Sequence, residues 1–265
     1  MNNDDTLLVI MTNQEILNIA LEQSALDCNC MPEDFFALEN KIVFSKANEK
    51  ARAYLPLPFE FDLVSYGSNI VAQVSERMKE TAEWYIGKYD VAHCFEAPNI
   101  IALNEKLAEF GYSVCFMAEY FLPDANLLRE LPCKYEMRIL YPKDFAQYYT
   151  DDWSNALCKK RKHLDVLAVG AFNGERLIGL AGCSADCEMM YQIGIDVLPE
   201  YRRQGIASAL VSRLAIEVIN LGKVPFYCAA WSNIKSVRSA IKAGFKPAWV
   251  EITARTREFV DEMNK

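Results

Sequence analysis

The sequence has little histidine and no long apolar run, and both shortages exclude classes of protein. Only His93 and His163 occur among the 265 residues, so a histidine-based catalytic site has few candidates. We expect each to be an ordinary surface or hydrogen-bonded histidine. No apolar stretch approaches the roughly 18 residues that cross a bilayer, which argues against a membrane protein.

Paired cysteines are also absent. The nine cysteines form an odd number, and no two are spaced as Cys-x-x-Cys. This spacing supports neither a disulfide framework nor a zinc site, and Cys28 with Cys30 would supply only half of a ligand set. We therefore expect buried, reduced thiols and no metal.

Positive charge is in deficit as well. The net charge is -8 and the pI is near 5.0, which argues against nucleic acid as a partner and suits cationic substrates. The opening MNNDDTLLVIM is acidic where a signal peptide would be basic, so we expect a cytoplasmic protein. The length allows two domains, and the 52% hydrophobic content is that of a globular chain.

The C-terminal half alternates strand-like and helix-like segments. Asn173-Gly174 favours a tight hairpin turn between two apolar runs. After residue 205, Ile206, Leu210, Leu214 and Val218 recur every four residues, which predicts a helix with one apolar face. The expected strands are 135–140, 166–172, 175–183, 189–198, 224–230 and 247–254, and the expected helices are 142–162, 206–219 and 232–243. The predicted order is β-α-β-β-β-α-β-α-β.

The stretch YRRQGIASAL, residues 201–210, joins a strand to a helix. Gly205 allows close backbone approach, and the free amides of the helix's first turn follow it at the positive end of the helix dipole. Arg202 and Arg203 add charge, so the motif indicates a phosphate or pyrophosphate site. The alternative is a simple glycine turn with two solvated arginines. Neither a Walker loop nor a G-x-G-x-x-G fingerprint is present.

Two segments at the right separation resemble a known family. GIDVLPEYRRQGIASALVSRLA and WSNIKSVRSAIKAGFKPAWVE are similar to the acetyl-CoA-binding core of the GNAT superfamily of N-acetyltransferases, over roughly residues 135–253. The resemblance implies an α/β (α+β) fold with a mixed central sheet, and acetyl-CoA as co-substrate. It implies backbone contacts to the pantetheine arm from Ile195 and Val197, pyrophosphate binding by Arg202, Arg203, Gln204, Gly205, Ile206 and Ala207, and a pantetheine contact or a helix cap from Asn233.

One position departs from the family pattern. Many GNAT relatives carry a tyrosine seven residues after the asparagine, where its hydroxyl protonates the leaving thiolate; this chain has Ala240. The thiolate then leaves unaided, or Tyr227 or water serves. The resemblance implies direct attack by the amine, so Cys228 is expected to be structural.

An attacking amine with a pKa near 10 must first lose a proton, and a carboxylate can take it. Asp196 and Glu188 are the candidates near the strand that ends at residue 198. We favour Asp196, because it lies beside the expected acyl site. The alternative is that Asp196 pairs with a neighbouring arginine.

The N-terminal part shows a weak internal repeat. APNIIALNEKLAEFGYSVCFMAEYFL, from residue 97, resembles WSNIKSVRSAIKAGFKPAWVEITA, from residue 231. Upstream, 61–67, 68–88 and 91–95 are predicted as strand, helix and strand, without an arginine-glycine loop. We predict a degenerate GNAT-like domain over 1–134 and the acetyltransferase domain over 135–265, a plan loosely similar to two-domain bacterial zwittermicin-resistance acetyltransferases. The alternative is an unrelated α+β domain.

Two classes of function remain. The first is acetyl transfer from acetyl-CoA to a primary amine of a small molecule, or less favoured, of a peptide or protein N-terminus. The second is a catalytically inactive acyl-CoA sensor, which Ala240 favours. GNAT domains often dimerise, so the resemblance also allows a homodimer.

Overall fold

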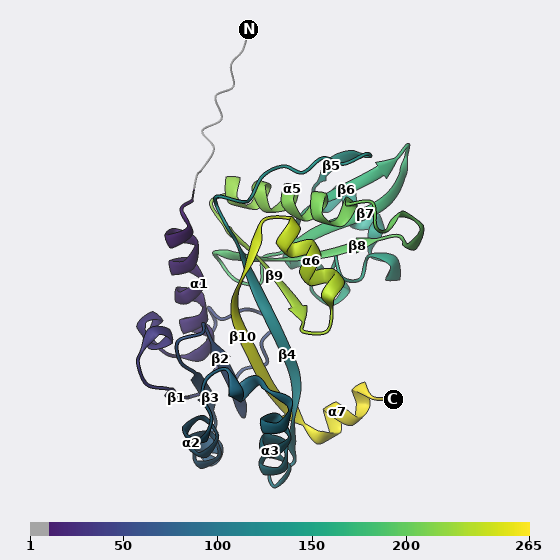
Figure 1. The fold of residues 1–265 in the computed structure, drawn as a ribbon. Helices are drawn as coiled ribbons and strands as arrows, with labels where there is room; N and C mark the ends of the chain where they lie inside the picture. Colours follow the sequence, from purple (N-terminus) through teal and green to yellow (C-terminus); the bar gives the residue numbers. More distant parts are fainter. Residues whose placement is uncertain (1–10) are drawn as a thin grey trace. The chain divides into compact units, whose positions relative to one another are not determined.

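Residues 11–265, the part of the chain that a computed structural model describes, form both strands and helices (Figure 1). The fold is of the α/β class with mixed parallel and antiparallel strands, as predicted. The acidic opening that led us to expect no signal peptide, except Met11, lies outside the described residues. No helix of the described residues has the length and apolar content to cross a membrane.

The chain divides into two compact units that interleave along the sequence. Among the described residues, unit 1 consists of 11–20, 121–228 and 233–246, and unit 2 of 21–120, 229–232 and 247–265. These units group the C-terminal residues 247–265 with the N-terminal half, so they differ from a division at residues 134 and 135. That division stays a prediction, because compactness does not by itself define a domain.

Unit 1 contains the predicted strand order except for the last strand, predicted over 247–254, which belongs to unit 2. Its elements are β5 (Glu136–Leu140), α4 (Pro142–Phe145), β6 (Asp165–Asn173), β7 (Arg176–Ser184), β8 (Met190–Val197), α5 (Ile206–Asn220), most of β9 (Val224–Ala230) and α6 (Ile234–Lys242). Strands β5 to β8 form an antiparallel meander, and β8 then pairs with β9 in parallel. A parallel neighbour requires a crossover, and α5 provides it.

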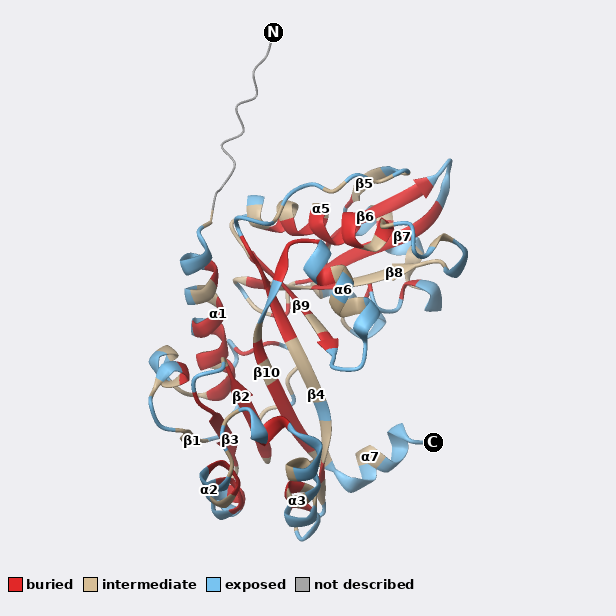
Figure 2. Ribbon diagram, viewed as in Figure 1, coloured by how far each residue is buried: buried red, intermediate tan, exposed pale blue. Residues whose placement is uncertain are grey.

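The two faces of the unit 1 sheet are covered differently. Helix α5 packs on β6, β7 and β8, and its predicted apolar face is fully buried (Figures 1 and 2). The other face is covered by a second cluster in which Phe145, Trp153 and Leu157 pack on Leu140, Ala168 and Leu180.

The long helix predicted for 142–162 is wrong. Only Pro142–Phe145 is α-helical, and short 3-10 turns follow at Ala146–Tyr148, Asp151–Trp153 and Lys159–Leu164. The segment is rich in Asp, Ser, Thr and Asn between residues 150 and 155, and such side chains compete with helical hydrogen bonding.

Unit 2 surrounds a second set of strands. Its elements are the last part of α1 (Asn13–Cys28), β1 (Lys41–Phe44), β2 (Phe61–Ser65), β3 (Val71–Val74), α2 (Lys79–Lys88), α3 (Ala97–Ala108), most of β4 (Tyr112–Pro123), most of β10 (Phe245–Thr256) and α7 (Arg257–Met263). Strand β2 pairs antiparallel with both β3 and β10, and β1 pairs parallel with β3. On one face, Phe61, Leu63 and Ile252 join the buried core formed with α2 and α3.

Two details of the N-terminal prediction are wrong and two are confirmed. Residues 71–74 form β3 rather than the start of a helix, because valines at both ends let this short run pair between β1 and β2. Residues His93–Phe95 are a 3-10 turn, not a strand. The helix-then-strand pattern of the proposed repeat is confirmed in both copies, as α3 with β4 and as α6 with β10.

Candidate functional site

Strands β8 and β9 pair over only half of β8. The recorded register runs from Met190 opposite Val224 to Ile193 opposite Tyr227. Residues 194–197 continue along β7, so the strand itself does not end there. The edge of β8 that carries Ile195 and Val197 therefore faces a cleft instead of a neighbouring strand, and both residues line that cleft.

The arginine-glycine loop forms one end of the cleft. Gly205 immediately precedes α5 with a φ of 82°, and Arg203 also has a positive φ, of 63°. A side chain at Gly205 would have open space, with only Lys242 Nζ at 3.7 Å, so the glycine is required by its backbone conformation rather than by crowding. The first amides of α5 have no partner within the helix, which makes this end of the cleft suited to an anion.

Helix α6 supplies cations that we did not select from the sequence. Lys235, Arg238 and Lys242 follow helical i, i+3, i+7 spacing and line the cleft together with Arg202 and Arg203. Among the described residues that line it, Asp196 is the one carboxylate. A cleft of about 590 Å³ in a protein of net charge -8 is thus cationic.

Asp196 is held by donors from a neighbouring loop. Its Oδ2 accepts hydrogen bonds from the backbone amides of Asn155, at 2.8 Å, and Ala156, at 2.9 Å. Its Oδ1 accepts a third from Asn155 Nδ2 at 2.6 Å. The partner of this carboxylate is therefore the loop at residues 155–156, and not the arginine that we considered.

Two glycines allow this loop to lie directly on the sheet. Gly182 and Gly194 are opposite each other on β7 and β8. A Cβ at Gly182 would lie 2.2 Å from the carbonyl oxygen of Ala156, and one at Gly194 would lie 1.8 Å from that of Asn155. Any side chain at either position would displace the loop that Asp196 holds.

Tyr227 is buried beside the cleft and hydrogen-bonded to α6. Its hydroxyl lies 2.7 Å from Ser236 Oγ. Burial raises the pKa of Tyr227, while the Ser236 contact opposes that rise, so the phenol is protonated at neutral pH. Ala240 on α6 is fully buried and contributes no polar group. Asn233 caps α6 by accepting from the Ser236 amide at 3.2 Å, one of its two expected roles.

The structure brings most of the predicted residues together, but not all of them. Ile195, Asp196, Val197, Arg202, Arg203, Gly205, Ile206, Ala207, Tyr227 and Asn233 line the cleft. Gln204 is not among its lining residues; its Oε1 accepts from the Tyr135 hydroxyl at 3.1 Å. Glu188 is exposed and precedes β8, whereas Asp196 is near the end of that strand. Asp196 is six residues, or about 20 Å, along β8 from Met190, and Glu188 comes two residues before Met190, so Glu188 is at the other end of the strand from Asp196.

One protein family matches the part of the chain that forms the cleft. Residues 129–245 match the model of the acetyltransferase (GNAT) family, which supports a GNAT acetyltransferase assignment for this region. No curated protein matches the chain.

Comparison with solved structures finds GNAT proteins at low sequence identity. A putative acetyltransferase from Novosphingobium aromaticivorans shares 18% identity over 54% of this chain and 66% of its own, with a TM-score of 0.41. A GCN5-related N-acetyltransferase-like protein from Streptococcus suis shares 19% over 59% of this chain and 69% of its own, with a TM-score of 0.44. An aminoglycoside N-acetyltransferase in complex with CoA shares 18% over 44% of this chain and 93% of its own, with a TM-score of 0.35. The chain thus spans about two thirds of the first two structures, and none of these values bears on its substrate.

Proposed function

We propose that the protein is an N-acetyltransferase that moves an acetyl group from acetyl-CoA to the primary amine of a small molecule. The observation that carries this proposal is the cleft of unit 1, where an unpaired strand edge, a helix N-terminus and five cationic side chains meet. A ligand with an amide-bearing arm and several phosphates suits each of these features. Acetyl-CoA has this composition, and it is the co-substrate that the GNAT resemblance implies.

The residues that would hold acetyl-CoA follow from the cleft. The amides at the start of α5 and the cations on both sides of Gly205 favour the pyrophosphate. The β8 edge at Ile195 and Val197 favours the amides of the pantetheine arm. Arg202 also stabilises this edge, because its Nε donates to the carbonyl oxygen of Val197 at 2.9 Å.

Proton transfer from the amine falls to Asp196 in this proposal. It is the one carboxylate among the described residues that line the cleft, and Glu188 is too distant to compete. Its three hydrogen bonds fix its orientation, yet a carboxylate offers about four acceptor directions, so one remains for an ammonium proton or a water. The thiolate is assisted by Tyr227, whose protonated hydroxyl can donate a hydrogen bond.

A second candidate is a binding protein for acyl-CoA without catalytic turnover. Ala240 favours it, because this buried position offers no proton donor where many GNAT relatives have tyrosine. The cleft would be retained in either case. The small-molecule amine, the cytoplasmic location and a homodimer accompany the enzyme proposal.

Two measurements distinguish the transferase from the acyl-CoA-binding protein: thiol release from acetyl-CoA, and acetyl-CoA binding measured by calorimetry. The purified protein is mixed with a panel of amines, amino acids, aminoglycosides and short peptides. Amine-dependent release supports the transferase and identifies its acceptor class. Binding without release on any amine supports the sensor, and absence of binding contradicts both.

A further inference from the structure

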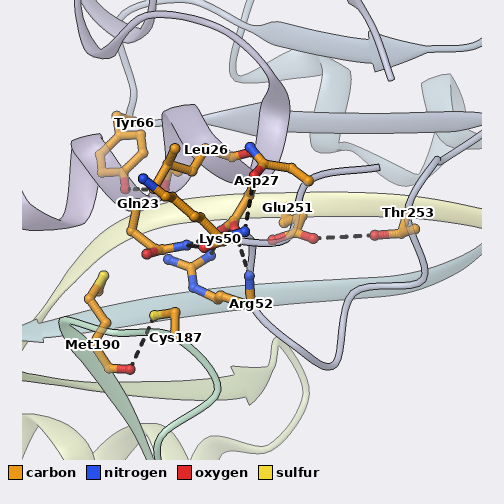
Figure 3. Close-up of polar contacts among 12 residues, drawn as sticks. Gln23, Leu26, Asp27, Lys50, Arg52, Tyr66, Cys187, Met190, Glu251 and Thr253 are labelled. Carbon is orange, nitrogen blue, oxygen red and sulfur yellow. Dashed lines mark hydrogen bonds and ion pairs between the residues drawn. The ribbon is translucent and has the colours of Figure 1, made fainter. Parts of the chain in front are cut away.

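Unit 2 contains a small polar cavity on the face of its strands opposite the apolar core. Asp62 and Gln73 are 1% exposed, Asp27 is 4% and Glu251 is 8% exposed, and all four line the cavity. Its free volume is about 10 Å³, which is room for one water-sized group. Figure 3 shows Asp27, Arg52, Glu251 and Thr253 in this region.

Asp27 and Arg52 form an ion pair and a hydrogen bond with each other. Arg52 Nη1 lies 2.7 Å from Asp27 Oδ2, and the Arg52 backbone amide donates to Asp27 Oδ1 at 2.9 Å. Gln23 Nε2 adds a third donor to Asp27 Oδ1 at 3.0 Å. Asp27 therefore has two hydrogen-bond donors on Oδ1 and the ion pair on Oδ2, and the arginine balances its charge.

Asp62 lies in the middle of a row across three strands. The register places it opposite Gln73 on β3 and opposite Thr253 on β10, so these side chains share the cavity face. Thr253 Oγ1 donates to Asp62 Oδ1 at 2.8 Å. No described residue donates to the second oxygen of Asp62, although this side chain is almost completely buried.

Glu251 is a second carboxylate in the same cavity. It is two residues from Thr253 on β10, with its Oε1 3.4 Å from Thr253 Oγ1. Burial, and then the charge of Glu251, raises the pKa of Asp62 well above its usual range. Burial also raises the pKa of Glu251, and Arg52 opposes that rise. Two ionised carboxylates here would be left with no cation of their own.

We propose that this cavity binds an ammonium group, held between Asp62 and Glu251. When Asp62 and Glu251 are both ionised, the three carboxylates that line the cavity exceed the one arginine by two negative charges, so a cation completes the site. An ammonium is water-sized and has at least three N–H donors, which fit the unpartnered oxygen of Asp62 and the adjacent Glu251. Among the described residues, no group of three or more His, Cys, Asp or Glu is arranged to hold a metal ion. The proposal does not depend on acetyl transfer.

Binding exchanges a cation for a proton. Burial favours the neutral form of Asp62 in the empty cavity, and its proton leaves to solvent when the ammonium enters and the carboxylate forms. Affinity therefore rises with pH until the pKa of Asp62 is passed. The other titratable or charged groups near the cavity are Asp27, Cys28, Arg52, Tyr66, Tyr120 and Glu251.

The test uses the whole protein with ammonium chloride, methylammonium chloride and, at matched ionic strength, sodium chloride. Melting temperature and calorimetry are measured at pH 6 and pH 8. We expect ammonium to raise the melting temperature above the sodium control, with tighter binding at pH 8 and with proton release. Methylammonium acting as well as ammonium indicates the end of a primary amine as the ligand, and ammonium acting alone indicates the free ion.

Three variants sharpen the result. Asp62→Asn and Glu251→Gln keep the shape of the site and should each weaken ammonium binding at least tenfold. Asp90→Asn removes an exposed carboxylate from the same unit and should change nothing. If neither cavity variant folds, the two-pH experiment on the unaltered protein still decides. The same melting temperature in ammonium and sodium salts, without proton release, would overturn the proposal and leave a buried acid pair with a structural role.

Discussion

The cleft of unit 1 and the cavity of unit 2 are both polar regions on a strand surface, but they are opposite in charge and in access. The cleft presents backbone amides and five cations, all on exposed or half-buried residues except the buried start of α5. The cavity presents three carboxylates that are at least nine-tenths buried. An open cationic cleft can bind a large anion while its side chains remain solvated, whereas a buried acidic cavity must either keep a proton or accept a small cation.

Gly194→Ala should damage the cleft most. The added Cβ would meet the Asn155 carbonyl, which is backbone and cannot move aside alone. We expect a loss of about 3 kcal/mol in the free energy of unfolding, from denaturant titration. Gly87→Ala, in helix α2 of unit 2 with no atom near the new Cβ, should instead be neutral or stabilise by up to about 1 kcal/mol. Equal effects of the two variants would show that the loop does not lie tightly on the sheet.

Asp196→Asn tests whether the single carboxylate of the cleft is a base. We expect kcat/KM to fall about 100-fold, or about 2.7 kcal/mol, with acetyl-CoA affinity nearly unchanged. Without a base, the rate should be proportional to the fraction of the amine that is already unprotonated. It should therefore rise about tenfold per pH unit below the amine pKa. Asn155→Ala loosens the same loop but keeps the carboxylate, so its pH profile should stay that of the unaltered protein. Unchanged turnover in Asp196→Asn would remove this residue from the mechanism.

Gly205→Val tests the anion end of the cleft. Valine is strained at the positive φ of this position, and the loop must shift. We expect acetyl-CoA affinity to fall about 30-fold, or about 2 kcal/mol. Gly174→Val puts the same strain at a φ of 62° in the β6–β7 turn, away from the cleft, and should leave affinity intact. Retained affinity in Gly205→Val would mean that the pyrophosphate binds elsewhere.

Tyr227→Phe removes the one buried hydroxyl that we assign to the thiolate. A decrease in kcat of about tenfold is expected, because a thiolate is a good leaving group that needs little assistance. Acetyl-CoA affinity should not change. Ser236→Ala removes the hydrogen-bond partner but keeps the phenol, and should retain most of the activity. An unaltered kcat in Tyr227→Phe would assign this proton to water.

Asp62→Asn tests the cavity through the pH dependence of stability. The folded protein holds this proton more tightly than the unfolded chain does, so Asp62 makes stability fall as pH rises from about 4 towards its raised folded pKa. The variant should lose that pH dependence. In sodium salts at pH 8, its free energy of unfolding should be about 1 kcal/mol higher than that of the unaltered protein. Chemical denaturation at pH 4 to 8 measures it. Parallel curves for the two proteins would show that Asp62 is not a buried acid.

The sequence predicted the cleft better than the cavity, for physical reasons. The loop at Gly205 and the apolar face of α5 are local patterns, so a short stretch of sequence was enough to find them. Lys235, Arg238 and Lys242 could have been found by the same helical spacing. The importance of Gly194 could not have been found in this way. A side chain is excluded there by the carbonyl of Asn155, which is 39 positions earlier in the chain. The cavity joins α1, the loop at Arg52, β2 and β10, and no local pattern connects elements so distant in sequence.

Calorimetric titration of the whole protein with acetyl-CoA shows whether the unit 1 cleft binds this ligand. We expect one site. Salt should weaken its affinity because five cations surround the phosphates, and Gly205→Val should weaken it further, whereas Gly174→Val should not. Saturable binding with this pattern would establish the unit 1 cleft as the acetyl-CoA site. No binding by the folded protein, or binding indifferent to Gly205→Val, would contradict it.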